Sequence, residues 1–201
     1  RARGPAASLQ GMSRPEEQAP PDLFYNEAEA NKYLHSSRMI EIQSAMSERA
    51  LEMLCLPEGV PCMLLDVGCG TGLSGETLEE AGHRWVGVDI SADMLRVAQR
   101  REVEGDLVHR DMGSGLPFRQ GTFDGAISVS AIQWLCYSDS NADVPRKRLV
   151  AFFQSLYKCL RRGARAALQF YPQARGRAAD ARAPLAPHAS RRPSRHAAPP
   201  P

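Results

Sequence analysis

Residues 64–72 read Leu64-Leu65-Asp66-Val67-Gly68-Cys69-Gly70-Thr71-Gly72, and this stretch decides the fold. The apolar run predicts the end of a buried strand, and the helical pattern from Leu73 predicts a helix directly after the glycines. Glycine lets the backbone turn sharply and approach a ligand closely, because no Cβ stands in the way. The N–H groups at the start of the helix can receive a polar end of that ligand. A glycine loop by itself can also be an ordinary structural turn, so the neighbouring elements matter.

Short apolar segments alternate with amphipathic ones along the rest of the chain. Strands are predicted at Met63–Val67, Trp85–Ile90, Asp106–His109, Phe123–Ser130 and Ala164–Tyr171. Helices are predicted at Leu73–Ala81, Ala92–Arg101 and Arg146–Leu160, the last closed by Gly163 as a C-cap, and one or two more within residues 26–56, starting at the N-cap Asn26. Near-continuous apolar strands that alternate with helices predict an α/β fold with a doubly wound, mainly parallel sheet.

Two details of the loop favour S-adenosylmethionine over a dinucleotide. The glycines Gly68, Gly70 and Gly72 are spaced G-x-G-x-G, and Leu73 stands at the position where the dinucleotide pattern G-x-G-x-x-G needs a glycine. Asp66 precedes the loop, where a carboxylate can pair with the positively charged amino group of the cofactor's methionine end. A pyrophosphate would be repelled there.

Further cofactor contacts are expected where the next two strands end. Asp89 can accept both ribose hydroxyl protons, or it can be the N-cap of the next helix, a role that Ser91 could fill instead. Asp111 would meet the adenine amino group with Met112 against the ring, although a plain turn aspartate is a nearly equal alternative. Met94 either lies on the adenine or simply packs its helix.

The composition limits other possibilities. A content of 43% hydrophobic and 24% charged residues fits one soluble globular domain, and no apolar run is long enough to span a bilayer. Five cysteines without a Cys-x-x-Cys pair indicate reduced thiols in the cytosol or nucleus and no metal site. Two arginines in residues 1–11 contribute +2, and six arginines less one aspartate in residues 174–201 contribute +5. Because the whole chain carries +2, residues 12–173 carry −5, which does not support autonomous nucleic-acid binding.

Composition also sets the expected domain boundaries. Residues 1–21 are predicted to be a disordered leader, and residues 22–173 the folded domain. Residues 174–201 consist mostly of Ala, Arg and Pro and cannot bury enough apolar surface to fold, which predicts a disordered tail.

The motifs of residues 12–173, in their order, resemble a known family. The glycine loop and the acidic strand ends are similar to those of class I methyltransferases. Closer similarity to the eukaryotic small-subunit rRNA guanine-N7 methyltransferases lies in Asp22-Leu23-Phe24-Tyr25, Lys32-Tyr33, Ser37-Arg38-Met39-Ile40, Gly70-Thr71-Gly72-Leu73-Ser74-Gly75, Glu104-Gly105-Asp106-Leu107, Phe123-Asp124-Gly125 and Ser130-Ala131-Ile132-Gln133-Trp134-Leu135-Cys136. The stretch that ends in Gln133-Trp134-Leu135 is the specific part, whereas many methyltransferases share the glycine loop.

The resemblance implies a Rossmann-like, S-adenosylmethionine-dependent enzyme that methylates guanine N7 in small-subunit rRNA during ribosome biogenesis. It implies work on pre-ribosomes in the nucleus (nucleolus and nucleoplasm) and cytoplasm, with no membrane association. It also implies a heterodimer with a small zinc-binding adaptor, which pairs along the edge strand near Leu107–Met112. The family's domain continues with a helix and two strands past the equivalent of Tyr171-Pro172, so the sheet is expected to lack its last strands here.

The chemistry of guanine N7 suits this set of residues. A sulfonium methyl is already activated and N7 has a free lone pair, so catalysis needs alignment rather than a general base. Ser128-Val129-Ser130 replaces the Asn/Asp-Pro-Pro-aromatic loop of exocyclic-amine methyltransferases, and the Pro61-Cys62 pair precedes the first strand, so a cysteine nucleophile is not indicated. Gln133 and Trp134 are the candidates to hydrogen-bond and stack an extruded base, although Trp134 could also be a packing aromatic.

Two other readings of function stay open. The chain could be a class I methyltransferase of a small molecule. It could also be a non-catalytic, truncated form that binds the adaptor only.

Overall fold

Five apolar segments form one parallel sheet in the computed structural model, which describes residues 14–136 and 144–171. The strands are β1 (Met63–Val67), β2 (Arg84–Asp89), β3 (Asp106–His109), β4 (Phe123–Val129) and β5 (Leu160–Gln169). Their order is β3-β2-β1-β4-β5, and each neighbouring pair is parallel. This confirms the predicted doubly wound α/β fold. The expected disordered segments at residues 1–13 and 174–201 lie outside the described residues.

Helices connect the strands and precede them. The α-helices are α1 (Pro21–Phe24), α2 (Glu27–His35), α3 (Ser37–Leu54), α4 (Leu73–Glu80), α5 (Ala92–Arg100) and α6 (Pro145–Cys159). Short 3-10 turns lie at η1 (Pro15–Glu17), η2 (Met112–Ser114) and η3 (Ile132–Cys136). Asn26 caps α2 as predicted, since its side chain accepts hydrogen bonds from the backbone N–H groups of Ala28 and Glu29. No helix in the described ranges is long and apolar enough to cross a membrane.

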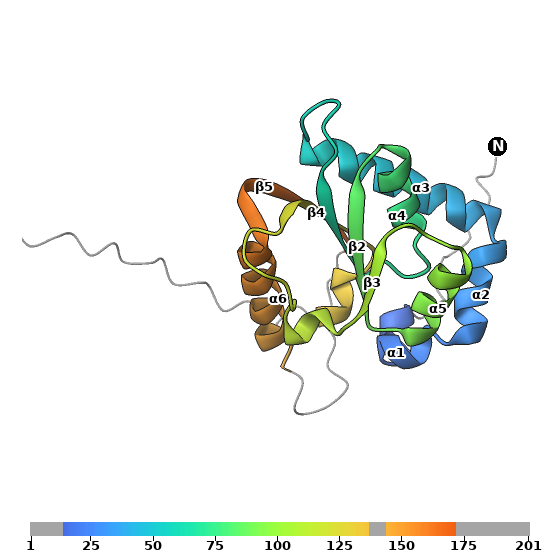
Figure 1. The fold of residues 1–201 in the computed structure, drawn as a ribbon. Coiled ribbons are helices and arrows are strands. Elements are labelled where there is room, and N and C mark those ends of the chain that lie inside the picture. Colours follow the sequence, from blue (N-terminus) through green and yellow to red (C-terminus); the bar gives the residue numbers. More distant parts are fainter. Residues whose placement is uncertain (1–13, 137–143, 172–201) are drawn as a thin grey trace, which may run out of the picture.

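An apolar core covers each face of the sheet. Side chains alternate along a strand, so Leu64 of β1 belongs to one core and Leu65 to the other. The first core includes Leu54 of α3 and contributions from α4 and α5, whereas the second includes Phe152 of α6. Figure 1 shows the same arrangement, with α6 on one side of the sheet and α3, α4 and α5 on the other. Two covered faces explain why the central strands β1 and β4 are almost continuously buried and apolar.

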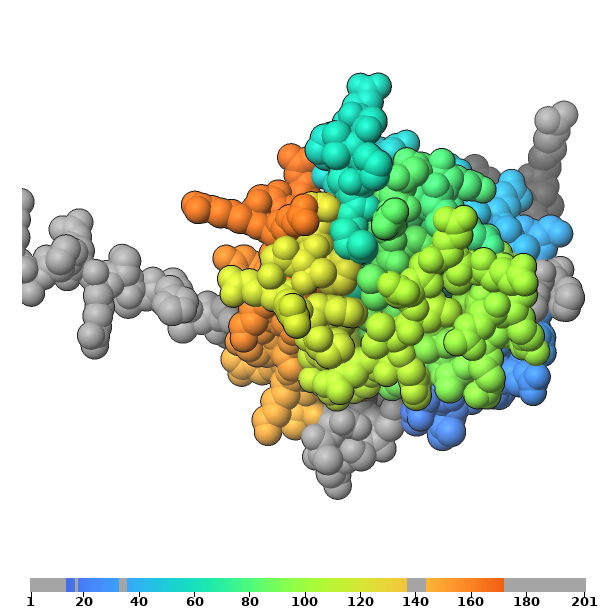
Figure 2. Space-filling model, in the orientation of Figure 1, coloured from blue at the N-terminus to red at the C-terminus, as the bar shows by residue number. Residues whose placement is uncertain are grey.

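The strand order reverses at β1, and this places the site. β2 and β3 lie on one side of β1, and β4 and β5 lie on the other. In a doubly wound sheet the crevice for a ligand opens at the carboxyl ends of the strands, where the order reverses. The loop of residues 55–62 precedes β1 and projects at the opposite, amino-terminal end of the strands (Figure 2).

The predicted role of Gly163 as the C-cap of α6 is wrong. The helix ends at Cys159, and Leu160 is already extended (φ −76°, ψ 143°) and paired with Phe123 of β4. Gly125 pairs with Arg165, so residues 161–164 of β5 bulge opposite a single residue of β4. Gly163, with φ +85°, supplies the left-handed conformation inside this bulge. A glycine after an amphipathic helix can be the C-cap of the helix or part of a β-bulge. The pairing of β5 with β4 decides between the two.

Ordered structure begins earlier than predicted. The predicted disordered leader extends to residue 21, but Pro15–Glu17 form η1 and Pro21 starts α1. The Gln18 N–H donates to the Pro15 carbonyl oxygen over 3.0 Å, and the side chain of Glu16 is buried. Proline fixes its own φ near the helical value, which favours such short turns.

Candidate functional site

A cavity of about 340 Å³ opens at the carboxyl ends of the strands. The loop after β1, the ends of β2 and β4, and the segment after β3 form its walls. Tyr25 and Pro21 of the α1 region close one side, and Met39, Ile42 and Met46 of α3 line another. Sites for small ligands are commonly 300–1,000 Å³ and mostly apolar with a few polar groups, and this cavity fits that description.

The glycine loop folds tightly over the end of β2. The N–H groups of Gly68 and Cys69 both donate to the Val88 carbonyl oxygen, over 2.7 and 3.2 Å. Gly68 has φ +77°, and a Cβ there would lie 2.2 Å from the Cβ of Ala131. Only glycine fits at this position, because any side chain would collide with the turn after β4. The loop and that turn therefore share one thin wall of the cavity.

Asp89 links the glycine loop to the next helix. Its Oδ2 accepts a hydrogen bond from the Gly70 N–H, and its Oδ1 accepts one from the Ser91 N–H, each over 2.8 Å. Ser91 is the N-cap of α5, since its hydroxyl accepts from the Met94 N–H over 3.1 Å. Burial raises the pKa of Asp89, and the Ser91 and Gly70 N–H groups oppose this. Each carboxylate oxygen has a second lone pair, so Asp89 can still accept two hydrogen bonds from a ligand.

Asp66 lies behind the glycine loop rather than in the cavity wall. Its side chain is fully buried, and its Oδ2 accepts a hydrogen bond from the Ser74 hydroxyl over 2.5 Å. The other oxygen, Oδ1, has no hydrogen-bond partner. Burial raises its pKa to about 7, the Ser74 hydrogen bond opposes the rise, and the charge of Asp89 adds to it. Ser74 does line the cavity, so its hydroxyl links Asp66 to the cavity wall.

Asp111 lines the cavity and also fixes the turn after β3. Its carboxylate accepts hydrogen bonds from the Gly113 N–H and the Ser114 hydroxyl, both over 2.9 Å, and from Arg148 of α6 over 2.8 Å. Burial raises the pKa of Asp111, but these hydrogen bonds and the Arg148 charge outweigh it and hold the pKa below its usual value. The turn role and the cavity role, predicted as alternatives, are therefore compatible. Met112 lies beside it on the cavity wall.

Trp134 and Gln133 lie in η3, on the turn after β4. The Trp134 ring packs against Phe24 and Tyr25 at centroid distances of 6.0 and 5.6 Å. It is almost fully buried but still lines the cavity. Gln133 donates its Nε2–H to the Ser130 carbonyl oxygen over 2.7 Å, and its Oε1 is buried without a partner.

The structure brings most of the predicted residues into one cavity. The following predicted residues line it: Gly68, Gly70, Asp89, Met94, Asp111, Met112 and Trp134. Asp66, Gly72 and Gln133 do not line it, although Gly72 and Gln133 adjoin lining residues in the chain and Asp66 accepts a hydrogen bond from one of them, Ser74. Sequence reasoning missed Tyr25, Arg148 and Tyr171, which line the cavity from segments distant in sequence. Arg110 and Ser74 also line the cavity and were not predicted. The sequence did hold a signal for both, because Arg110 adjoins Asp111 and Ser74 belongs to the motif Gly70–Gly75.

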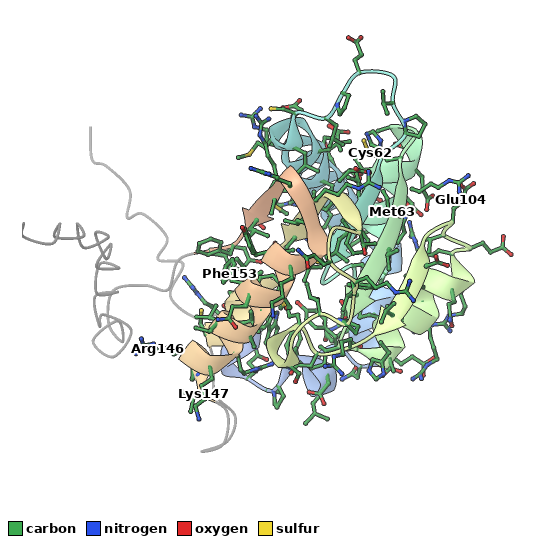
Figure 3. All side chains as sticks on the ribbon, turned by 60° about the vertical axis from the view of Figure 1, so that its left-hand side comes forward. Cys62, Met63, Glu104, Arg146, Lys147 and Phe153 are labelled. Carbon is green, nitrogen blue, oxygen red and sulfur yellow. The ribbon has the colours of Figure 1, made fainter. Side chains whose placement is uncertain are left out.

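Chemically, the cavity can bind and orient more readily than it can move protons. Its described lining contains neither histidine nor lysine. Burial and the charges of Asp89 and Asp66 raise the pKa of the Cys69 thiol well above its usual value, so the thiol stays neutral. Outside the cavity, Arg146 and Lys147 lie exposed on the first turn of α6 beside Arg148 (Figure 3).

Comparisons with known proteins show which proteins the chain is similar to. Residues 65–168 match the family described as "Methyltransferase domain". An 18S rRNA (guanine-N(7))-methyltransferase of Arabidopsis thaliana is 64% identical over 162 residues, which cover 80% of this chain and 56% of that protein. The Mus musculus protein of the same description is 61% identical over 160 residues, covering 80% and 57%. These identities confirm the resemblance seen in the motifs, and the chain spans little more than half the length of these curated relatives.

The fold comparison agrees with the sequence comparison. A TehB-like SAM-dependent methyltransferase from Corynebacterium glutamicum superposes with a TM-score of 0.54 at 20% identity, covering 71% of this chain and 73% of that one. At this identity the likeness shows a shared fold alone.

Proposed function

The chain belongs to the methyltransferase-domain family, and from this premise we propose that it binds S-adenosylmethionine and methylates N7 of a guanine in small-subunit rRNA. The observation that carries the proposal is the Asp89 carboxylate, which holds the glycine loop and keeps two acceptor positions for a ligand in the cavity. The relatives named for 18S rRNA guanine-N7 methylation support the choice of substrate.

The residues present fit this cofactor. Asp89 would accept the two ribose hydroxyl protons. Asp66, with its unpartnered buried oxygen, would attract the amino group of the methionine end, with Ser74 between them. Asp111 would accept from the adenine amino group, and Met112 and Met94 would pack on the ring. We propose these roles for the cavity residues, with Gly68, Gly70 and Gly72 shaping the loop.

The chemistry asks little of the protein beyond orientation. S-adenosylmethionine, when bound, supplies a methyl group that is already activated as a sulfonium. Guanine N7 has a lone pair and no proton to lose, so alignment and exclusion of water are the remaining tasks. A described lining without histidine or lysine, and with a neutral Cys69, suits a transfer that uses neither a general base nor a cysteine nucleophile.

We assign base positioning to Gln133 and Trp134. The free Oε1 of Gln133 is a buried acceptor, and the Watson–Crick edge of guanine offers N–H donors. Trp134 offers a ring at the cavity wall for stacking, once Tyr25 and Phe24 give way. The exposed cations Arg146 and Lys147 beside the cavity would face the phosphate backbone.

The β3 edge is the proposed docking site of a small zinc-binding adaptor. β3 is the last strand on its side of the described sheet, and its residues are exposed or half-buried. Strand addition at Leu107–Met112 would satisfy the unpaired backbone groups of such an edge. We propose that this complex acts on pre-ribosomes in the nucleus and cytoplasm.

The test begins with calorimetric titration of S-adenosylmethionine into the chain co-purified with the adaptor. We expect micromolar binding, which Asp89→Ala weakens tenfold or more, equivalent to about 1.4 kcal/mol. Asp93→Ala is the matched control, because Asp93 lies on α5 outside the cavity and pairs with the exposed Arg96. Transfer of labelled methyl to small-subunit rRNA is then mapped by borohydride and aniline cleavage at N7-methylguanine.

Each outcome separates the candidate functions. Label that enters small metabolites but not rRNA would favour a small-molecule methyltransferase. A stable adaptor complex that binds no cofactor would mark a non-catalytic form. Loss of binding in Asp93→Ala as large as in Asp89→Ala would contradict the assigned pocket.

A further inference from the structure

Ser130 has an unusual backbone conformation at the end of β4. Its φ is +55°, in the left-handed region that side chains with a Cβ seldom adopt. The other non-glycine residues with positive φ in the described ranges are Cys55 and Glu102, which follow α3 and α5 and do not line the cavity. Ser130 does line it, directly before the η3 turn that carries Gln133 and Trp134. Such strain at a ligand site needs surrounding contacts to hold it.

The side chain of Gln169, on β5, supplies those contacts. Its Oε1 accepts hydrogen bonds from both the N–H and the hydroxyl of Ser130, each over 2.8 Å. The accepting atom must be the oxygen, because an N–H group can only donate. The Gln169 backbone carbonyl oxygen also accepts from the Ser130 N–H over 3.0 Å. One residue of the neighbouring strand therefore fixes the N–H and the hydroxyl of the strained residue.

The other side of Ser130 is fixed as well. Its carbonyl oxygen accepts from the Gln133 amide over 2.7 Å, so the strained peptide and the proposed base-binding residue move together. The next residue, Ala131, lies against Gly68 with no room for even one additional methyl group. Because contacts hold Ser130 on both sides, its conformation sets where η3 places Trp134 in the cavity wall and Gln133 beside it.

We propose that Gln169 is a positioning residue for the methyl acceptor. Its side-chain oxygen keeps Ser130 left-handed and thereby holds the η3 turn at the distance that methyl transfer requires. Gln169 does not line the cavity itself, and so acts through Ser130. The inference rests on the proposed function of the site, and it concerns the acceptor side rather than the cofactor side.

The test compares three variants of the chain in its adaptor complex. Gln169→Met removes the acceptor at similar length, and Gln169→Glu keeps an oxygen that can accept both hydrogen bonds. Gln99→Met is the control, because Gln99 is an exposed residue of α5. We expect Gln169→Met to lower kcat for rRNA methylation tenfold or more while the Kd for S-adenosylmethionine stays within twofold. Small misplacements of reacting groups have effects of this size. Gln169→Glu should recover most of the rate.

A second measurement does not depend on turnover. The three-bond HN–Hα coupling and the 13Cα shift of Ser130, measured by NMR in each complex, report whether its φ is positive. We expect a positive φ in the parent and in Gln169→Glu, and its loss in Gln169→Met. If the parent complex methylates nothing, the proposed function fails while this measurement still decides the role of Gln169.

Two results would overturn the inference. One is a Gln169→Met complex in which Ser130 keeps its positive φ, since the backbone carbonyl of Gln169 would then be sufficient. The other is a Gln169→Glu variant as impaired as Gln169→Met, since the side-chain oxygen would then not be the group that matters.

Discussion

Replacing Gly68 with alanine would place a methyl group into the shared wall between the glycine loop and the turn after β4. The added Cβ would lie 2.2 Å from the Cβ of Ala131, whereas nonbonded carbon atoms normally rest about 3.5–4.0 Å apart. One of the two segments must therefore retreat by more than about 1 Å. Both segments belong to the site, so the change should affect cofactor binding as well as stability.

The magnitude has two parts that a control can separate. Gly68 has φ +77°, which costs a residue with a Cβ about 1–2 kcal/mol. Gly82 has nearly the same φ, +80°, but a Cβ there would meet nothing within 4 Å. Gly82→Ala should therefore cost about 1–2 kcal/mol. Gly68→Ala should add about 1–3 kcal/mol for overpacking.

The assay is urea unfolding of the chain and both variants, followed by circular dichroism, with calorimetric titration of S-adenosylmethionine into each. We expect the order of stability parent, Gly82→Ala, Gly68→Ala, with cofactor affinity lost only in the last. If Gly68→Ala unfolds at the same urea concentration as Gly82→Ala and still binds the cofactor, the tight contact does not exist and the reasoning is refuted.

Three further changes test the remaining parts of the site and core. Burial raises the pKa of Asp66 to about 7, and a cationic amino group favours the ionised form. Affinity for S-adenosylmethionine should therefore fall about tenfold per pH unit below 7, and calorimetry should find this slope absent in Asp66→Asn. Phe152→Ala, at a fully buried site, should cost about 3–5 kcal/mol in urea unfolding, whereas Phe153→Ala, at 44% exposure, should cost under about 1 kcal/mol. Arg148→Met should lower stability by about 1 kcal/mol at pH 7, because it removes a partly buried ion pair. This loss should persist down to about pH 4, the ordinary carboxyl pKa, and should vanish only below the lowered pKa of Asp111. Arg146→Met, at an exposed position, should show none of it.

The fold could be predicted because local and global signals agree. The strands show apolar runs, the helix after the glycine loop shows a helical period, and the glycines allow a tight turn between them. All three signals agree with one arrangement, the doubly wound sheet. β1 and β3 therefore have the predicted bounds, β4 differs by one residue at its end, and β2 differs by one residue at each end. Gly163 misled because its local signal fits two geometries. The pairing of Leu160 with Phe123, which decides between them, is not visible in the local sequence.

The candidate site was predictable only where its residues follow strand ends. Asp89 and Asp111 could be placed because parallel strands bring their carboxyl ends to one edge. The position of Asp66 behind the wall depends on how the loop closes over Ser74. The packing of Trp134 against Tyr25 and the hold of Gln169 on Ser130 join segments far apart in sequence. No periodicity encodes such pairs.

The place of α3 has a consequence for synthesis of the chain. Its inner face, with Ala50 and Leu54, packs on β4 and β5, and the Arg165 guanidinium donates to the Leu54 carbonyl oxygen across 111 residues. A ribosome adds about 5–20 residues per second, so α3 must wait about 5–20 seconds for its partner strand. During that interval the part of its apolar side that packs on β5 stays uncovered. A helix made early thus reaches its full packing only when β5 emerges.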